Sequence, residues 1–154
     1  MSAPPVGSAV HATALVLGEH GILIRGPAGA GKSSLARELV ARAQEAGRHG
    51  ALISDDRVVL TATHGRLIAR AVPAIAGLLE IRGLGIVEVP HQEAALVRLV
   101  VDLDEDPTRH PEQSALITVL EGVELPQVVV NRALAASVVV WWFGHLRDRF
   151  VTVP

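Results

Sequence analysis

A glycine-rich stretch near the N-terminus has the residue types and the spacing needed to bind phosphate. It fits the pattern G-x-x-x-x-G-K-[ST], with an apolar run before it and a helix-forming run after it. Glycines allow a tight turn whose backbone N–H groups point at phosphate oxygens, and the positive end of the following helix favours an anion there. The pattern therefore predicts a P-loop that binds a nucleotide. The residues expected to contact it are Gly26, Pro27, Ala28, Gly29, Ala30, Gly31, Lys32, Ser33 and Ser34.

Two side chains of this stretch have specific chemistry. Lys32 is the only lysine in the chain, and it supplies a compact charge that can reach the β- and γ-phosphates, which the planar fork of an arginine would not reproduce. The hydroxyl of Ser33 can bind Mg²⁺. The alternative is an ordinary glycine-rich turn before a helix, and the motif and its context together argue against it.

Adjacent carboxylates follow the short apolar run 51–53. One of Asp55 and Asp56 can assist Mg²⁺ while the other accepts a proton from an attacking hydroxyl as a general base. A solvated Asp-Asp turn is the alternative. An acidic–basic pair, Glu80 and Arg82, precedes Gly83-Leu84-Gly85, and an ordinary surface ion pair beside a turn is as plausible there as a functional role.

The composition restricts the class of protein. The 154 residues suit one domain, and 49% hydrophobic but only 3% aromatic residues require an aliphatic core. A net charge of −2 without a basic run argues against nucleic-acid or anionic-membrane binding. The absence of cysteine fits a cytoplasmic protein, the first residues do not resemble a signal peptide, and the apolar run 138–143 is too short to span a bilayer.

Strands that alternate with a few helices must position these residues, which indicates an α/β domain with a central sheet. The predicted strands cover residues 10–17, 22–25, 51–53, 58–63, 67–71, 96–103, 116–120 and 128–130, and the predicted helices cover 33–46, 73–79 and 132–149. Asn131 is expected to cap the last helix, in which one of Trp141 and Trp142 packs inward while the other is free for an interface. The polar, proline-containing segment 104–113 is expected to be a mobile loop.

The segment Glu80-Ile81-Arg82-Gly83-Leu84-Gly85-Ile86, together with the P-loop and the two aspartates, resembles the HPr kinase/phosphorylase family, whose signature reads close to EIRGLGI. His11 also falls where that family has a histidine on the strand before the P-loop. The resemblance implies a P-loop NTPase-like kinase domain with a central mixed sheet and flanking helices. It covers only the catalytic domain, so residues 1–154 are expected to form one such domain of the short type found in some Gram-negative bacteria, with residues 1–8 as a flexible arm.

The resemblance implies a cytoplasmic, homo-oligomeric (hexameric) enzyme that uses ATP and Mg²⁺ to phosphorylate a serine of the phosphocarrier protein HPr within the phosphotransferase system. It also implies the reverse step, in which inorganic phosphate removes that group and pyrophosphate forms. By the resemblance, Asp55 would be the general base in the kinase direction and the general acid in the reverse step, and His11 would lie near the phosphates or Asp55. Asp56 would bind Mg²⁺ or orient Asp55, and Glu80 would contact the metal shell. Arg82 would contact a phosphate or the substrate protein. Arg109 is the candidate for the family's mobile catalytic arginine, and Arg132 resembles part of a later Gly-Arg-Asn segment.

The P-loop departs from the family's usual sequence, since Ala28 stands for a serine and Ser34 for a glutamate. Both residues lie beside the reacting phosphate, so the balance between kinase and phosphorylase activity stays open. Two other functions also stay open, a small-molecule P-loop kinase and a non-catalytic nucleotide sensor. The chain has no counterpart of the lid of small-molecule kinases, and its complete set of Lys32, Ser33, Asp55 and Asp56 favours an enzyme. The other histidines show no metal-ligand spacing.

Overall fold

A computed structural model describes residues 7–146 of the chain, without the side chain of Leu146. The strands are β1 (Ser8–Val10), β2 (Thr13–Leu17), β3 (His20–Arg25), β4 (Gly50–Ser54), β5 (Val58–Thr63), β6 (Arg66–Ala71), β7 (Leu78–Ile81), β8 (Gly85–Glu88), β9 (Ala94–Leu103), β10 (Ile117–Leu120) and β11 (Val123–Val130). The α-helices are α1 (Lys32–Glu45) and α2 (Arg132–Trp141); 3-10 turns cover Pro73–Ile75 and Gln113–Leu116, and a π turn covers Trp142–Leu146.

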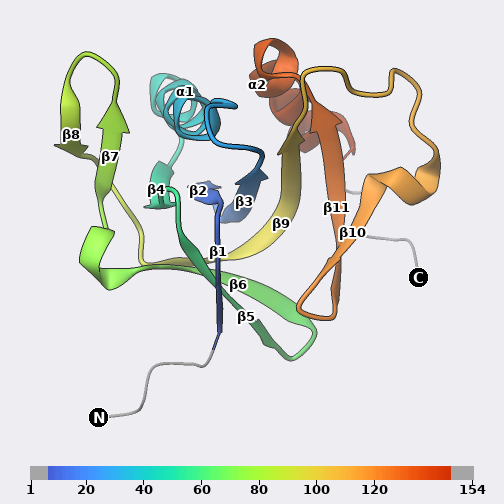
Figure 1. The fold of residues 1–154 in the computed structure, drawn as a ribbon, viewed down its shortest axis with the longest axis horizontal. Helices are drawn as coiled ribbons and strands as arrows, with labels where there is room; N and C mark the ends of the chain where they lie inside the picture. The colour runs from blue at the N-terminus through green and yellow to red at the C-terminus, as the bar shows by residue number, and fades with distance from the viewer. Residues whose placement is uncertain (1–6, 147–154) are drawn as a thin grey trace.

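A long strand, β9, holds the main sheet together. Its first residues pair antiparallel with β6, and its later residues pair parallel with β3 on one side and β11 on the other. The order β1-β5-β6-β9-β3-β2-β4 results, with β11 joined to β9 and β10 to β11. Figure 1 shows β9 curving through the sheet, with α1 and α2 next to each other over one part and the β5–β6 hairpin below. The mixed sheet with flanking helices is as the sequence predicts.

Alternating side chains divide the core between the two faces of this sheet. In β3, Ile22 and Ile24 pack with Leu35 and Leu39 of α1, whereas Leu23 belongs to the cluster on the other face. All four aliphatic residues named from β3 and α1 in the first cluster are buried. A strand buried on both faces reads as a continuous apolar run, which is why the strand before the P-loop is recognisable in the sequence.

The predicted strand 10–17 is wrong in one respect, because two strands replace it. β1 pairs with β5, whereas β2 pairs with β3 and β4, and the non-strand residues His11 and Ala12 separate the two strands. Both halves are extended and largely apolar, so only the choice of partner strands reveals the break. Ser8, the last residue of the predicted arm, instead begins β1, and residues 1–6 of that arm lie outside the described part.

The predicted helix 73–79 is also largely wrong. Only Pro73–Ile75 form a 3-10 turn, and Gly77, with a φ of 76°, ends it. The following residues form β7, which pairs with β8 in a separate two-stranded hairpin that includes the Glu80–Ile86 segment. Figure 1 shows this hairpin beside α1, apart from the main sheet.

The C-terminal strands and helix depart from the prediction in their extents. Pro126 lies inside β11, where the ladder with β10 ends and the ladder with β9 begins at Gln127, a junction that tolerates proline. α2 continues only as the π turn to Leu146, and the rest of the predicted helix lies outside the described residues. One of the two tryptophans packs inward, as predicted, and the structure shows that it is Trp142, whereas Trp141 is exposed.

Replacement of Asn131 by Ala is expected to lower the free energy of unfolding by about 1 kcal/mol, the usual value of an N-cap side chain. The predicted cap is confirmed, because the backbone N–H of Leu134 donates to Asn131 Oδ1 at 3.0 Å. Denaturant titration of both proteins measures the difference. Asn131→Ser, which keeps a capping oxygen, is the matched control, and equal stability of Asn131→Ala and wild type would contradict the assignment.

Candidate functional site

The P-loop connects β3 to α1 with the local geometry that the motif requires. Gly29 and Gly31 have φ values of 82° and 100°, in the left-handed region that glycine adopts without strain, and α1 begins at the next residue, Lys32. The Lys32 side chain folds back over the loop, where its Nζ donates to the carbonyl oxygens of Gly26 at 2.8 Å and Pro27 at 3.1 Å. The loop therefore holds its only lysine at the position where phosphate is expected.

Asp55 links three elements around the start of α1. It follows the last residue of β4, and its Oδ1 accepts a hydrogen bond from Ser33 Oγ at 2.6 Å and another from Thr13 Oγ1 of β2 at 2.9 Å. A short hydroxyl-to-carboxylate hydrogen bond is a strong one. Two predicted site residues, Ser33 and Asp55, thus contact each other directly, and Asp55 is held by donors from two separate elements.

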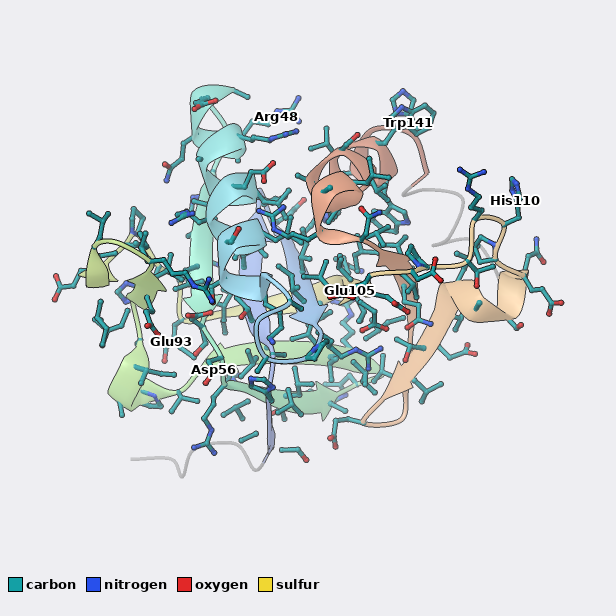
Figure 2. All side chains as sticks on the ribbon, turned by 45° about the horizontal axis from the view of Figure 1, so that its top comes forward. Arg48, Asp56, Glu93, Glu105, His110 and Trp141 are labelled. Carbon is teal, nitrogen blue, oxygen red and sulfur yellow. The ribbon has the colours of Figure 1, made fainter. Side chains whose placement is uncertain are left out.

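The neighbouring carboxylate, Asp56, has a different partner. Its φ of 68° is left-handed, which Asp tolerates better than most residues, and this turn directs the two carboxylates apart. Asp56 Oδ1 accepts a hydrogen bond from His11 Nε2 at 2.7 Å, with the side chains 68% and 52% exposed. Figure 2 shows Asp56 below the N-terminal end of α1, at the end of the helix opposite Arg48. The break between β1 and β2 thus places His11 beside the aspartate pair.

Arg132 also reaches the P-loop helix. Its guanidinium donates to Ser34 Oγ at 2.7 Å and to Glu38 Oε1 at 3.0 Å. A Cβ atom on Gly31 would lie only 2.9 Å from Arg132 Cδ, so the absence of a side chain at Gly31 makes room for the arginine. The arginine at the start of α2 therefore lies against the last P-loop glycine.

Three predicted site residues do not contact this cluster. Glu80 and Arg82 lie on the β7–β8 hairpin, and Arg109 lies in the segment between β9 and the 3-10 turn at Gln113. All three are exposed, and within residues 7–146 no hydrogen bond or ion pair connects any of them to the P-loop or the aspartates. Figure 2 shows His110, the neighbour of Arg109, at the outer end of its loop, away from Asp56.

Sequence reasoning missed two members of the cluster, Thr13 and Glu38. Thr13 is a fully buried polar residue in an otherwise apolar strand, and that contrast was a usable signal for a residue with a specific partner. Glu38 had no such signal, because it contacts Arg132 from 94 positions away. Among the described residues, no set of three or more His, Cys, Asp or Glu side chains is arranged to hold a metal, and no helix there is long and apolar enough to cross a membrane.

Comparison with known proteins identifies similar sequences. A family model described as HPr Serine kinase C-terminal domain matches residues 6–130. An HPr kinase/phosphorylase from Mycoplasma mycoides subsp. mycoides SC is 35% identical over 103 residues, covering 62% of this chain and 31% of the relative. One from Clostridium tetani is 43% identical over 70 residues, covering 46% of this chain and 21% of the relative. The chain thus spans about a fifth to a third of the length of these curated relatives.

A solved structure has the same fold. The Hpr(Ser) kinase/phosphatase from Coxiella burnetii superposes with a TM-score of 0.76 at 23% identity, covering 93% of this chain and 98% of the other. This likeness confirms the predicted α/β fold with its mixed sheet, P-loop and flanking helices.

Proposed function

Because this chain belongs to the HPr Serine kinase C-terminal domain family, we propose that it is an ATP- and Mg²⁺-dependent kinase that phosphorylates a serine of the phosphocarrier protein HPr. The membership confirms the resemblance predicted from Glu80–Ile86. The observation that best supports the proposed activity is the position of the Asp55 carboxylate, which accepts hydrogen bonds from Ser33 and Thr13 directly beside the P-loop. A base at that place lies next to the site where a phosphoryl group would be transferred.

Asp55 acts as the general base in the proposed reaction. Its carboxylate accepts the proton of the attacking serine hydroxyl, the serine oxygen bonds to the γ-phosphorus, and the bond from that phosphorus to the β,γ-bridging oxygen breaks, which leaves ADP. In the reverse step, an oxygen of inorganic phosphate bonds to the phosphorus of phosphoserine, and the bond from that phosphorus to the serine oxygen breaks, which forms pyrophosphate. Asp55, in its protonated form, donates the proton to the leaving serine oxygen. The hydrogen bond from Thr13 holds the carboxylate in place for both directions.

The side chains around α1 suit Mg²⁺ and ATP. Mg²⁺ prefers oxygen ligands and is usually held by one or two carboxylates together with the substrate phosphates, and Ser33 with Asp56 offers such oxygens beside the loop. Glu80 is a further proposed ligand from the β7–β8 hairpin. Bound Mg²⁺ would supply neutralising charge at the phosphates. Lys32 binds the phosphates, His11 orients Asp56 through their hydrogen bond, and Arg82 contacts a phosphate or HPr.

The proposal includes the setting of the enzyme. We place it in the cytoplasm as a homo-oligomer, a hexamer by family resemblance, in which exposed Trp141 is available for an interface.

Incubation of the protein with labelled ATP, Mg²⁺ and purified HPr tests the proposed function. Phosphoserine on HPr, and its loss with release of pyrophosphate when inorganic phosphate replaces ATP, is the expected result. Transfer to a small molecule without HPr would favour a metabolite kinase, and nucleotide binding without any transfer would favour a sensor. Either outcome would overturn the proposal.

Replacement of Arg109 by Ala is expected to lower kcat by about 10²-fold while ATP affinity changes little, because a clamp on developing phosphoryl charge acts in the transition state. Steady-state phosphorylation of HPr and an independent ATP titration measure the two effects. Arg132→Met is the informative comparison, since Arg132 already contacts Ser34. Unchanged turnover in Arg109→Ala with a large loss in Arg132→Met would assign the clamp to Arg132.

A further inference from the structure

An ion pair connects the residue before the P-loop to the neighbouring strand. Arg25, the last residue of β3, donates from Nε to Asp102 Oδ1 at 2.7 Å and from Nη2 to Asp102 Oδ2 at 2.8 Å. The two residues are partners in the parallel register of β3 and β9, and their side chains are 30% and 27% exposed. A bidentate pair of this kind fixes orientation as well as distance.

The same arginine is connected to both ends of the segment that carries Arg109, residues 104–112. Asp102 lies two positions before that segment. Arg25 Nη2 also donates to Gln127 Oε1 at 3.2 Å, and Gln127 Nε2 donates to the carbonyl oxygen of Ala115, just after the segment, at 2.9 Å. Arg25 therefore contacts one residue shortly before the 104–112 segment, Asp102, and is linked through Gln127 to Ala115, three positions after it.

On its other side the pair adjoins the P-loop. Gly26 follows Arg25 directly, and its carbonyl oxygen accepts the hydrogen bond from Lys32 Nζ. Side chains alternate along β3, so Arg25 lies on the sheet face shared with Leu23, opposite the face where Ile24 packs against the helices. Arg25 is thus connected to the P-loop only through the main chain at Gly26, and its side chain contacts Asp102 and Gln127 on the opposite face of the sheet from the helices.

We propose that Arg25 is a positioning residue that holds the P-loop and the 104–112 segment in one fixed relation, so that Lys32 and Arg109 address the same phosphoryl group. The catalytic part of this inference rests on the proposed function. A partly buried ion pair is by itself weak evidence for stability, because desolvation offsets much of its attraction. An orientational role accounts better for its bidentate geometry and for the continuation through Gln127.

The test compares Arg25→Met with Arg98→Met, an exposed arginine of β9 to which no hydrogen bond or ion pair is assigned within residues 7–146. Hydrogen exchange is measured at three hydrogen-bonded amides of the segment and its ends, those of Asp104, Asp106 and Ala115. We expect faster exchange there in Arg25→Met, with exchange at the amides of α1 nearly unchanged and a modest fall in the melting temperature, because Asp102 loses its partner but is 27% exposed. We also expect kcat for HPr to fall about tenfold, more than ATP affinity, since small misplacements of catalytic groups are costly. Arg98→Met should match wild type in every measurement.

Asp102→Asn provides a second, nearly isosteric variant should Arg25→Met fail to fold. It should reproduce the faster exchange of Arg25→Met. The double variant Arg25→Met/Asp102→Asn should show the same exchange rates and the same kcat as Arg25→Met, because the two residues act through one contact. Arg25→Lys keeps the charge but not the fork, so it should restore only part of the protection.

Wild-type exchange at all three amides, or faster exchange spread evenly over the chain, would overturn the proposal. If wild type fails to phosphorylate HPr, the proposed function fails, while the exchange data still decide whether Arg25 holds the segment.

Discussion

Replacement of Asp55 by Asn is expected to lower kcat for phosphorylation of HPr by about 10²- to 10⁴-fold, the contribution that a positioned general base usually makes. The amide keeps the size of the carboxylate and one acceptor oxygen for Thr13 or Ser33, so the fold and the P-loop should persist. The amide cannot take up the serine proton at neutral pH. The loss should therefore appear in turnover much more than in ATP binding.

Quantification of phosphoserine on HPr, with ATP affinity measured by calorimetry on the same preparations, checks this result. Glu45→Gln makes the same carboxylate-to-amide change on an exposed residue at the far end of α1 and should behave as wild type. Phosphorolysis should fall in parallel with kinase activity in Asp55→Asn, because one group serves both directions. Turnover close to wild type would show that Asp55 is not the base and would move attention to Asp56.

The sequence was a reliable guide where the structure is local. The strand, the glycines and the first turn of α1 are consecutive, so the motif alone predicts where Lys32 and Ser33 lie relative to the loop. The hydrogen bond between Ser33 and Asp55 spans 22 positions. It still follows from the sequence pattern, because Asp55 comes directly after β4, a strand that lies in the same sheet as β3, with only β2 between them.

Contacts that depend on strand partners or on single dihedral angles could not be derived from local sequence patterns, and only the family resemblance placed His11 near the phosphates or Asp55. His11 lies beside Asp56 because the chain leaves the β5 ladder and joins the β3 and β4 ladders at that point, which no local pattern encodes. The left-handed φ of Asp56 decides which aspartate meets His11 and which meets Ser33. Arg132 reaches Ser34 only through the packing of α2 against α1, across 98 positions.

Replacement of Lys32 by Ala is expected to lower kcat by about 10²-fold or more, because it removes a fixed donor aimed at developing charge. Lys32→Arg should rescue little, because a planar guanidinium does not reproduce the compact ammonium whose Nζ lies 2.8 Å from Gly26 O. Arg37→Ala, an exposed basic residue of the same helix, is the control and should retain activity.

The chain's single lysine also permits a direct test of phosphate binding that is independent of HPr. Labelling of lysine with ¹³C at Cε alone gives one signal, that of the carbon next to Nζ of Lys32. Addition of ATP should shift this signal, because Nζ must exchange its carbonyl partners, Gly26 and Pro27, for phosphate oxygens. The same shift should occur in Asp55→Asn, where binding persists without transfer. A signal that ATP leaves unchanged, together with full activity of Lys32→Ala, would contradict the P-loop assignment, whereas a shift in an inactive protein would separate nucleotide binding from kinase chemistry.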